Sequence, residues 1–205
     1  MKKLIAAIIV LMVTGTDLAA RLPFLKFGVE WGYDAGFMEF HHFNYLSSEG
    51  YRINDKWTGA RYATNGSILL NAGIRLKEKS TLALYGGYSG ICEGNRVFPL
   101  SLRYTFNRNQ YSRNGMFYYA DAGIGLHVPK TDTRVQSPCI IGRLGSGYRI
   151  ALSSFCSLDF MLSLKISYEK PLIIDPDTIT YVPDTDIRTS KAFYGAICIS
   201  TAFNF

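Results

Sequence analysis

Residues 157–169 read SLDFMLSLKISYE, and two different patterns alternate within them. Every even-numbered position is apolar or aromatic, whereas the odd-numbered positions carry Asp159, Lys165 and Glu169 among serines and one methionine. Successive side chains of a β-strand point to opposite faces. The stretch therefore predicts a strand with one apolar and one charged face, and either a protein core or a lipid bilayer can cover the apolar one.

The N-terminus favours the bilayer. Lys2 and Lys3 precede an apolar run, residues 4–13, and the small residues Ala19 and Ala20 follow shortly after it. This order predicts a secretory signal peptide over residues 1–20, which leaves residues 21–205 as the mature barrel domain. The run is shorter than the ~20 residues of a membrane-spanning helix, and no later apolar run is longer. We therefore expect export without a helical anchor.

The same alternation recurs along the chain and predicts eight strands, over residues 24–34, 67–77, 80–89, 98–106, 116–128, 139–150, 157–169 and 192–205. Their lengths match the ~9–11 residues with which a tilted strand crosses a membrane. Short connections alternate with longer ones, which include irregular segments at residues 35–66 and 170–190. Such asymmetry is typical of outer-membrane barrels. The predicted fold is all-β, an eight-stranded antiparallel up-and-down transmembrane β-barrel.

Aromatic residues collect at the ends of the predicted strands, on the apolar face. One end holds Tyr104, Phe106, Tyr118, Tyr148, Phe160, Phe203 and Phe205, and the other holds Trp31, Tyr33, Tyr88, Tyr168 and Phe193. Two such girdles mark the two membrane interfaces of a barrel. A secreted lipocalin-like barrel is the alternative fold, but it has no need for aromatic residues at these positions.

The chain ends with ICISTAFNF, an alternating strand that closes on Phe203 and Phe205. This ending resembles the C-terminal assembly signal of Gram-negative outer-membrane proteins, although Ser200 stands where that signal prefers glycine. Over residues 21–205 the chain resembles small eight-stranded barrels of the OmpA/OmpX type. The resemblance implies an outer-membrane location, contact with outer-membrane lipid and handling by the barrel-assembly machinery. We expect a monomer, and the resemblance names no activity.

An eight-stranded barrel has a lumen only just wide enough for side chains. The charged residues predicted to face it are Lys26, Glu30, Arg75, Arg103, Asp121, Arg143, Arg149, Asp159, Lys165 and Glu169. Opposite charges confined there should pair, because an unpaired buried charge costs several kcal/mol. We expect a lumen plugged by a polar network, and a narrow gated channel is the alternative.

Catalysis is the third function class. Some barrels of this architecture modify lipid A with His and Ser near the membrane surface. The candidates here would be His41, His42, Ser47, Ser48 and Glu49 in the first long connection and the lumenal His127. The spacing shows no nucleophile with a base and an orienting group. Two adjacent histidines also leave a metal coordination sphere open. We expect no enzyme, no metal and no cofactor.

The first long connection is unusually aromatic for a solvated loop. It predicts either an ordered extension of the strands or a recognition surface for a glycan or protein, with His41, His42, Tyr45, Tyr51 and Trp57 as candidate contacts. The acidic residues near Asp175 and Asp177 lack a calcium-loop pattern. The net charge of +6 is dispersed, so we expect no nucleic-acid partner.

Overall fold

A computed structural model describes residues 24–60, 62–92, 95–110, 113–128, 136–153 and 156–205. The predicted signal peptide, residues 1–20, lies outside these residues. Regular structure in the described part is entirely β. No helix in it has the length and apolar character needed to cross a membrane.

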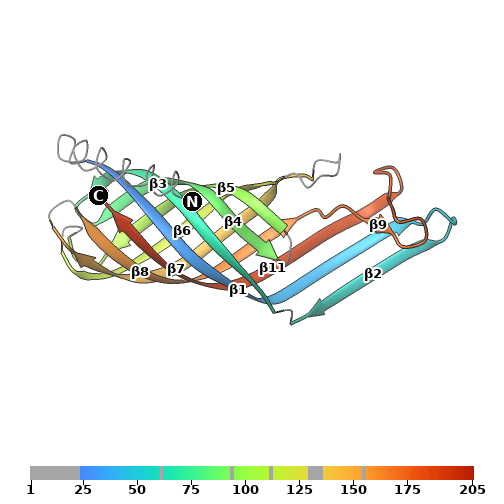
Figure 1. Cartoon of the computed structure of the whole chain (residues 1–205), viewed down its shortest axis with the longest axis horizontal. Helices are drawn as coiled ribbons and strands as arrows, with labels where there is room; N and C mark the ends of the chain where they lie inside the picture. Colours follow the sequence, from blue (N-terminus) through green and yellow to red (C-terminus); the bar gives the residue numbers. More distant parts are fainter. Residues whose placement is uncertain (1–23, 61, 93–94, 111–112, 129–135, 154–155) are drawn as a thin grey trace, which may run out of the picture.

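Eight strands close into an antiparallel barrel (Figure 1). They are β1 (Leu25–Leu46), β3 (Ala63–Lys77), β4 (Ser80–Cys92), β5 (Asn95–Asn107), β6 (Gly115–His127), β7 (Cys139–Ala151), β8 (Ser157–Glu169) and β11 (Ile187–Asn204). Each barrel strand pairs with the next one along the chain, and β11 pairs back onto β1, with Glu30 opposite Ala202. The predicted all-β fold, an eight-stranded antiparallel up-and-down barrel, is confirmed.

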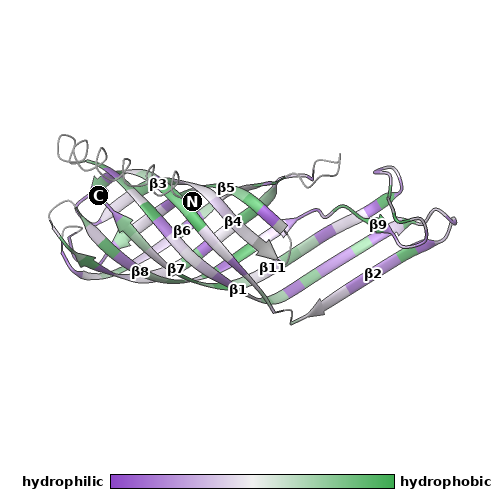
Figure 2. Ribbon diagram, in the orientation of Figure 1, coloured by the Kyte–Doolittle hydropathy of each residue, from purple (hydrophilic) through white to green (hydrophobic). Residues whose placement is uncertain are grey.

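Hydrophilic and hydrophobic residues alternate along the barrel strands (Figure 2), and the two faces of the wall differ as this alternation predicted. On β8, Leu162 and Leu164 are 55% and 53% exposed on the outside, whereas Lys165 is 3% exposed in the lumen. The other barrel strands repeat this arrangement, with apolar side chains outward and with all the buried charged side chains, together with some apolar ones, inward. Such a wall suits a bilayer, because every strand edge is paired and the outward surface is apolar.

Residues 35–66 fall outside the eight predicted strands, but most of the described ones form strands, which confirms the ordered extension given as one of the two predictions for this connection. β1 continues to Leu46, and β2 (Arg52–Gly59) returns antiparallel to it before β3 begins. β11 begins at Ile187, earlier than predicted, and pairs with the extended part of β1 as far as Tyr45. The extension is ordered because β1 has hydrogen-bonded neighbours on both sides. We call residues 38–46, β2 and residues 187–194 the outer sheet, which projects beyond the other barrel strands (Figure 1).

A β-bulge at the base of the outer sheet sets which residues face inward. The register shifts between Gly36 and Met38, so that one extra residue enters β1. Asp34 faces the lumen below the bulge, and Glu39 takes the same side above it. The inner face of the outer sheet therefore carries Glu39, His41, Phe43 and Tyr45, and its outer face carries the residues between them.

A small hairpin, β9 (Ile174–Asp175) with β10 (Thr180–Tyr181), packs near the tip of the outer sheet (Figure 1). Ile173 and Val182, on either side of the hairpin, form a buried cluster with Tyr45. The second long connection is thus anchored to the first.

Candidate functional site

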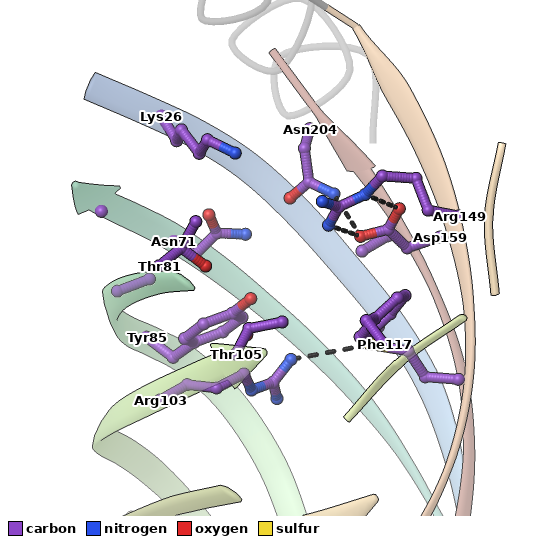
Figure 3. A pocket seen from close by; sticks show the side chains of 14 residues that line it. Lys26, Asn71, Thr81, Tyr85, Arg103, Thr105, Phe117, Arg149, Asp159 and Asn204 are labelled. Carbon is purple, nitrogen blue, oxygen red and sulfur yellow. Dashed lines mark hydrogen bonds and ion pairs between the residues drawn. The ribbon is translucent and has the colours of Figure 1, made fainter. Parts of the chain in front are cut away.

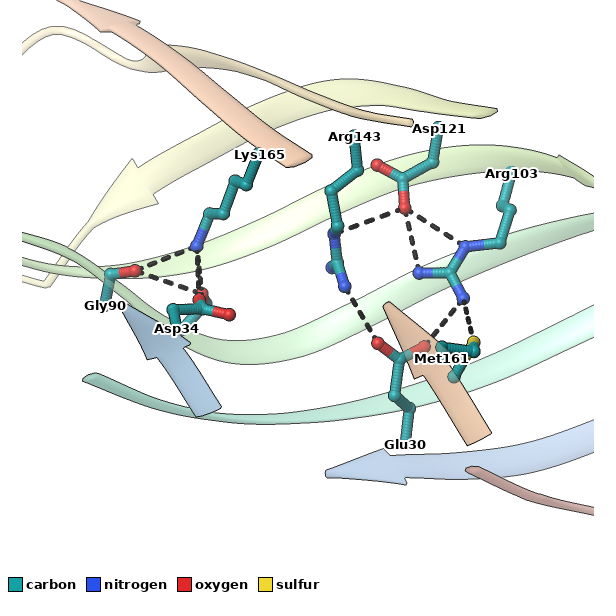
Figure 4. Close-up of polar contacts among 9 residues, drawn as sticks. Glu30, Asp34, Gly90, Arg103, Asp121, Arg143, Met161 and Lys165 are labelled. Atoms are coloured by element: carbon teal, nitrogen blue, oxygen red, sulfur yellow. Dashed lines mark hydrogen bonds and ion pairs between the residues drawn. The ribbon is translucent and has the colours of Figure 1, made fainter. Parts of the chain in front are cut away.

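The middle of the lumen holds a buried cluster of two arginines and two carboxylates (Figure 4). Glu30 on β1 is fully buried and accepts hydrogen bonds from Arg103 at 2.7 Å and Arg143 at 2.8 Å. Arg103 also donates to Asp121 through Nε at 3.1 Å and Nη2 at 2.9 Å. The cluster joins β1, β5, β6 and β7 across the lumen.

Aromatic rings complete the surroundings of Arg103. Its guanidinium carbon lies 3.9 Å from the ring centre of Tyr85 and 4.3 Å from that of Tyr119. Stacking on two rings uses the faces of the guanidinium, while its edges donate to the two carboxylates. This position holds an arginine in a single orientation.

A second pair lies nearer the outer sheet (Figure 4). Lys165 on β8 donates to Asp34 at 2.8 Å, to the hydroxyl of Ser89 at 2.7 Å and to the carbonyl of Gly90 at 2.9 Å. These acceptors satisfy all three ammonium protons. At the same end, His127 lies 3.4 Å from Glu169.

The third group lies at the opposite end of the lumen (Figure 3). Arg149 donates two hydrogen bonds to Asp159, through Nε and Nη2. Arg149 also donates to Asn107, and Asn204 donates to Asp159. Lys26 lies in the same part of the lumen, and Arg75 is half-buried on β3. A cavity of about 30 Å³ remains between these side chains, which is room for one or two water molecules.

Apolar side chains fill the lumen between and above the charged groups. Phe117, Tyr119, Met161 and Ala202 form one buried cluster. Val97, Cys139 and Ile141 form another, against which Tyr194 packs. Charged groups and apolar clusters thus both occupy the interior of the barrel.

The predicted list of charged lumen residues omitted several of these groups. Asp34 shares the two-residue spacing of Lys26 and Glu30 and could have been included on that ground. Phe117 and Tyr119 share the spacing of Asp121. Their identity as lumen residues was available from the alternation, but their stacking partners were not.

The inner face of the outer sheet carries a histidine between two carboxylates. His41 Nε2 lies 3.1 Å from Asp55 and its Nδ1 lies 3.6 Å from Glu39. Its ring stacks on Phe43 and Trp57, with ring centres 4.7 Å and 5.7 Å apart. An open groove of about 430 Å³ lies beside them, lined by His41, Asp55, Trp57 and Ala60.

The other candidate contacts are separated from this groove. Tyr45 is buried in the cluster with Ile173 and Val182, which corrects its prediction as a surface contact. Its two-residue spacing from Phe43 turns it inward, where the second connection covers it. His42 lies on the outer face, where Nε2 bonds to Asn54 at 3.0 Å. Tyr51 is exposed at the tip of the outer sheet.

Two carboxylates, Asp175 and Asp177, hold the tip of the outer sheet, and we call their hydrogen bonds to Ser47, Ser48 and Tyr51 the latch. Asp175 accepts a hydrogen bond from the backbone N–H of Ser48 at 2.7 Å, and Asp177 accepts from Ser47 at 2.9 Å and Tyr51 at 2.6 Å. The Ser48 N–H bond is the main cause that lowers the pKa of Asp175, and the bond to Asp177 raises that of Tyr51. These carboxylates are occupied by donors, and no metal-binding cluster occurs among the described residues.

The latch also bears on the catalytic candidates. The Ser47 hydroxyl donates to Asp175 and Asp177, while His41 and His42 bond to Asp55 and Asn54. In the described part of the chain, therefore, no histidine is hydrogen-bonded to Ser47 or Ser48. The arrangement lacks the nucleophile–base contact that acyl transfer needs.

Comparisons with known proteins find similar folds. No protein-family model matches the chain, and no curated protein sequence is detectably similar. Neisserial surface protein A is 12% identical with a TM-score of 0.47, over 86% of this chain and 95% of that protein. The outer-membrane protein OprG from Pseudomonas aeruginosa is 8% identical with a TM-score of 0.48, over 88% and 95%. The Escherichia coli outer-membrane protease OmpT is 9% identical with a TM-score of 0.42, over 89% and 96%. Similarity at this level assigns no activity to this chain.

Proposed function

We propose that the protein is an exported outer-membrane barrel with a plugged lumen, which presents its outer sheet for interaction at the cell surface. The observation that carries this proposal is the inverted distribution of side chains, with leucines exposed on the wall and ion pairs buried within it. A soluble barrel with this wall would expose a large continuous apolar surface to water.

Fractionation tests the location. We expect the mature chain in the outer-membrane fraction, with different gel mobility before and after boiling, because closed barrels resist detergent. Recovery as a soluble periplasmic protein would overturn the proposal.

The plugged lumen is a separate statement with its own test. The buried ion pairs and the two apolar clusters of the lumen support it, and the cavity beside Lys26 and Asp159 has room for only one or two waters. We expect no steady conductance when the purified protein is inserted into planar bilayers. Discrete channel openings of the folded wild-type protein would instead identify a gated pore.

Surface interaction is supported by the groove beside His41. Trp57 offers an indole that is 40% exposed, next to the carboxylate of Asp55. Aromatic anchors of this kind carry much of the energy of recognition sites. We propose a surface glycan or protein as the partner and a non-enzymatic role.

A glycan array probed with the labelled, detergent-solubilised protein tests the groove. We expect Trp57→Ala to weaken binding at least ~10-fold, because a recognition anchor contributes about 2 kcal/mol or more. Tyr62→Ala is the matched control, since Tyr62 is a 77% exposed aromatic residue outside the groove. Equal effects of the two substitutions would contradict a role for the groove.

A further inference from the structure

The outer face of the outer sheet carries a row of basic residues on adjacent strands. His42 on β1 lies directly opposite Lys56 on β2 and directly opposite Lys191 on β11. Lys170 follows the last pair between β8 and β11, Glu169 with Ala192, and thus lies next to Lys191. We call Lys56, His42, Lys191 and Lys170 the basic row, and its three lysines are exposed.

Nothing on this face of the outer sheet neutralises the row. The carboxylates of the outer sheet, Glu39 and Asp55, lie on its inner face beside His41. No ion pair joins any of the three lysines to a carboxylate in the described part of the chain, and His42 bonds only to the amide oxygen of Asn54. Like charges on neighbouring strands are destabilising, so the row is suited to an anion that the chain itself does not supply.

An aromatic row lies next to the basic row, one step toward the barrel. Phe40 lies opposite Phe193, and Phe193 lies opposite Tyr168. Their ring centres are 6.1 Å and 4.7 Å apart. Rows on one face of a sheet are about 6.6 Å apart along the strand. Aromatic rings prefer the membrane interface, which places the basic row at the depth of the lipid headgroups.

We infer that the basic row binds the phosphate of an anionic lipid headgroup in the outer leaflet. The inference rests on the proposed outer-membrane location. Lys56 and Lys191 flank His42, and the flexible lysine side chains can converge on a single phosphate between the strands. The aromatic row below contacts the apolar part of the same lipid. A free anion would not contact the aromatic row. A lipid is therefore the occupant, because its phosphate suits the basic row and its apolar part suits the aromatic row.

Titration in micelles tests this inference. Folded protein in nonionic detergent is titrated with bis-phosphorylated lipid A, with its dephosphorylated form and with inorganic phosphate, and Kd is measured by calorimetry. We expect the phosphorylated lipid to bind most tightly. Each lysine near a charged lipid surface contributes about 1 kcal/mol, so the double variant K56Q/K191Q should bind roughly 30-fold more weakly.

The control variant is K77Q/K79Q, which removes two exposed lysines from the opposite end of the barrel. It should bind like the wild type. If the double variant folds poorly, two further measurements take its place. The K170Q variant should bind the phosphorylated lipid more weakly, and added salt should weaken binding of the wild type. Unchanged affinity in folded K56Q/K191Q, equal affinity for the dephosphorylated lipid, or equally tight binding of inorganic phosphate would each overturn the inference. None of these results alters membrane fractionation, so the proposed location is judged separately.

Discussion

Removing the carboxylate of Glu30 should destabilise the barrel more than any surface change of the same chemistry. Glu30 is fully buried and accepts two short bonds from arginines. Arg103 keeps both of its bonds to Asp121 in a Glu30→Gln variant, so the loss falls mainly on Arg143. The nearest other carboxylate to Arg143 is Asp121, at 3.5 Å.

The size of the loss follows from these contacts. Removing one partner of a buried ion pair costs about 3–5 kcal/mol, because the remaining charge stays buried without compensation. The bonds that Arg103 retains place the expected loss in the lower half of that range, at about 3–4 kcal/mol. Glu78→Gln, the same change in an exposed turn, should stay within about 0.5 kcal/mol of the wild type.

Urea titration of the protein in phosphatidylcholine vesicles measures the free energy of unfolding. Tryptophan fluorescence reports insertion, because Trp31 lies on the lipid-facing wall and is 47% exposed. A double-mutant cycle with Arg143→Met should give a coupling energy of about 2 kcal/mol. Similar losses for Glu30→Gln and Glu78→Gln, or additive effects in the cycle, would refute the role assigned to the lumen cluster.

Further experiments test the lipid-facing wall and the latch. Leu162→Arg should lower the free energy of unfolding by about 2–4 kcal/mol in the same titration, because Leu162 faces the bilayer near mid-strand. The control Leu152→Arg, in an exposed turn, should lower it by less than about 1 kcal/mol. Equal losses would contradict the lipid-facing assignment. Lys165→Arg keeps the charge in the lumen and should also cost less than Leu162→Arg. Asp175 has a lowered pKa, so its contribution to the latch is fully present above the ordinary carboxyl value of about 4 and is lost as pH falls through the lower folded value. The amide shift of Ser48 in NMR spectra should follow that loss, and a shift that does not change below pH 4, or that still changes in Asp175→Asn, would rule the latch out.

Local alternation was enough to predict most of the barrel. β8 spans Ser157–Glu169 as predicted, because consecutive residues alternate between apolar and polar along its whole length. The predicted faces of the wall and most of the charged lumen residues follow from the same two-residue spacing. The inward glycines also belong to this pattern. At Gly123 an added Cβ would lie 2.2 Å from the carbonyl oxygen of Leu100, so the backbones approach too closely for a larger residue.

Residues 35–66 show where local alternation stops predicting strands, although their aromatic content did predict order there. The bulge between Gly36 and Met38 changes which alternate residues face inward, so one spacing does not continue through the segment. Its order depends on β11, which pairs with β1 from the far end of the chain, as well as on the local hairpin between β1 and β2. Tyr45 is buried for the same reason, since Ile173 and Val182 reach it only after the second connection folds back.

The sequence by itself determined the class of fold, most of the barrel strands and the side of the barrel wall on which most of its charges lie. Only the tertiary structure decided which charges meet, because Glu30 and Arg143 are 113 residues apart and are joined across the lumen by barrel closure. It also decided the basic row, which exists because strand register places His42 between Lys56 and Lys191. A slip of one residue in either pairing would move those lysines to the other face, and no local pattern specifies that register.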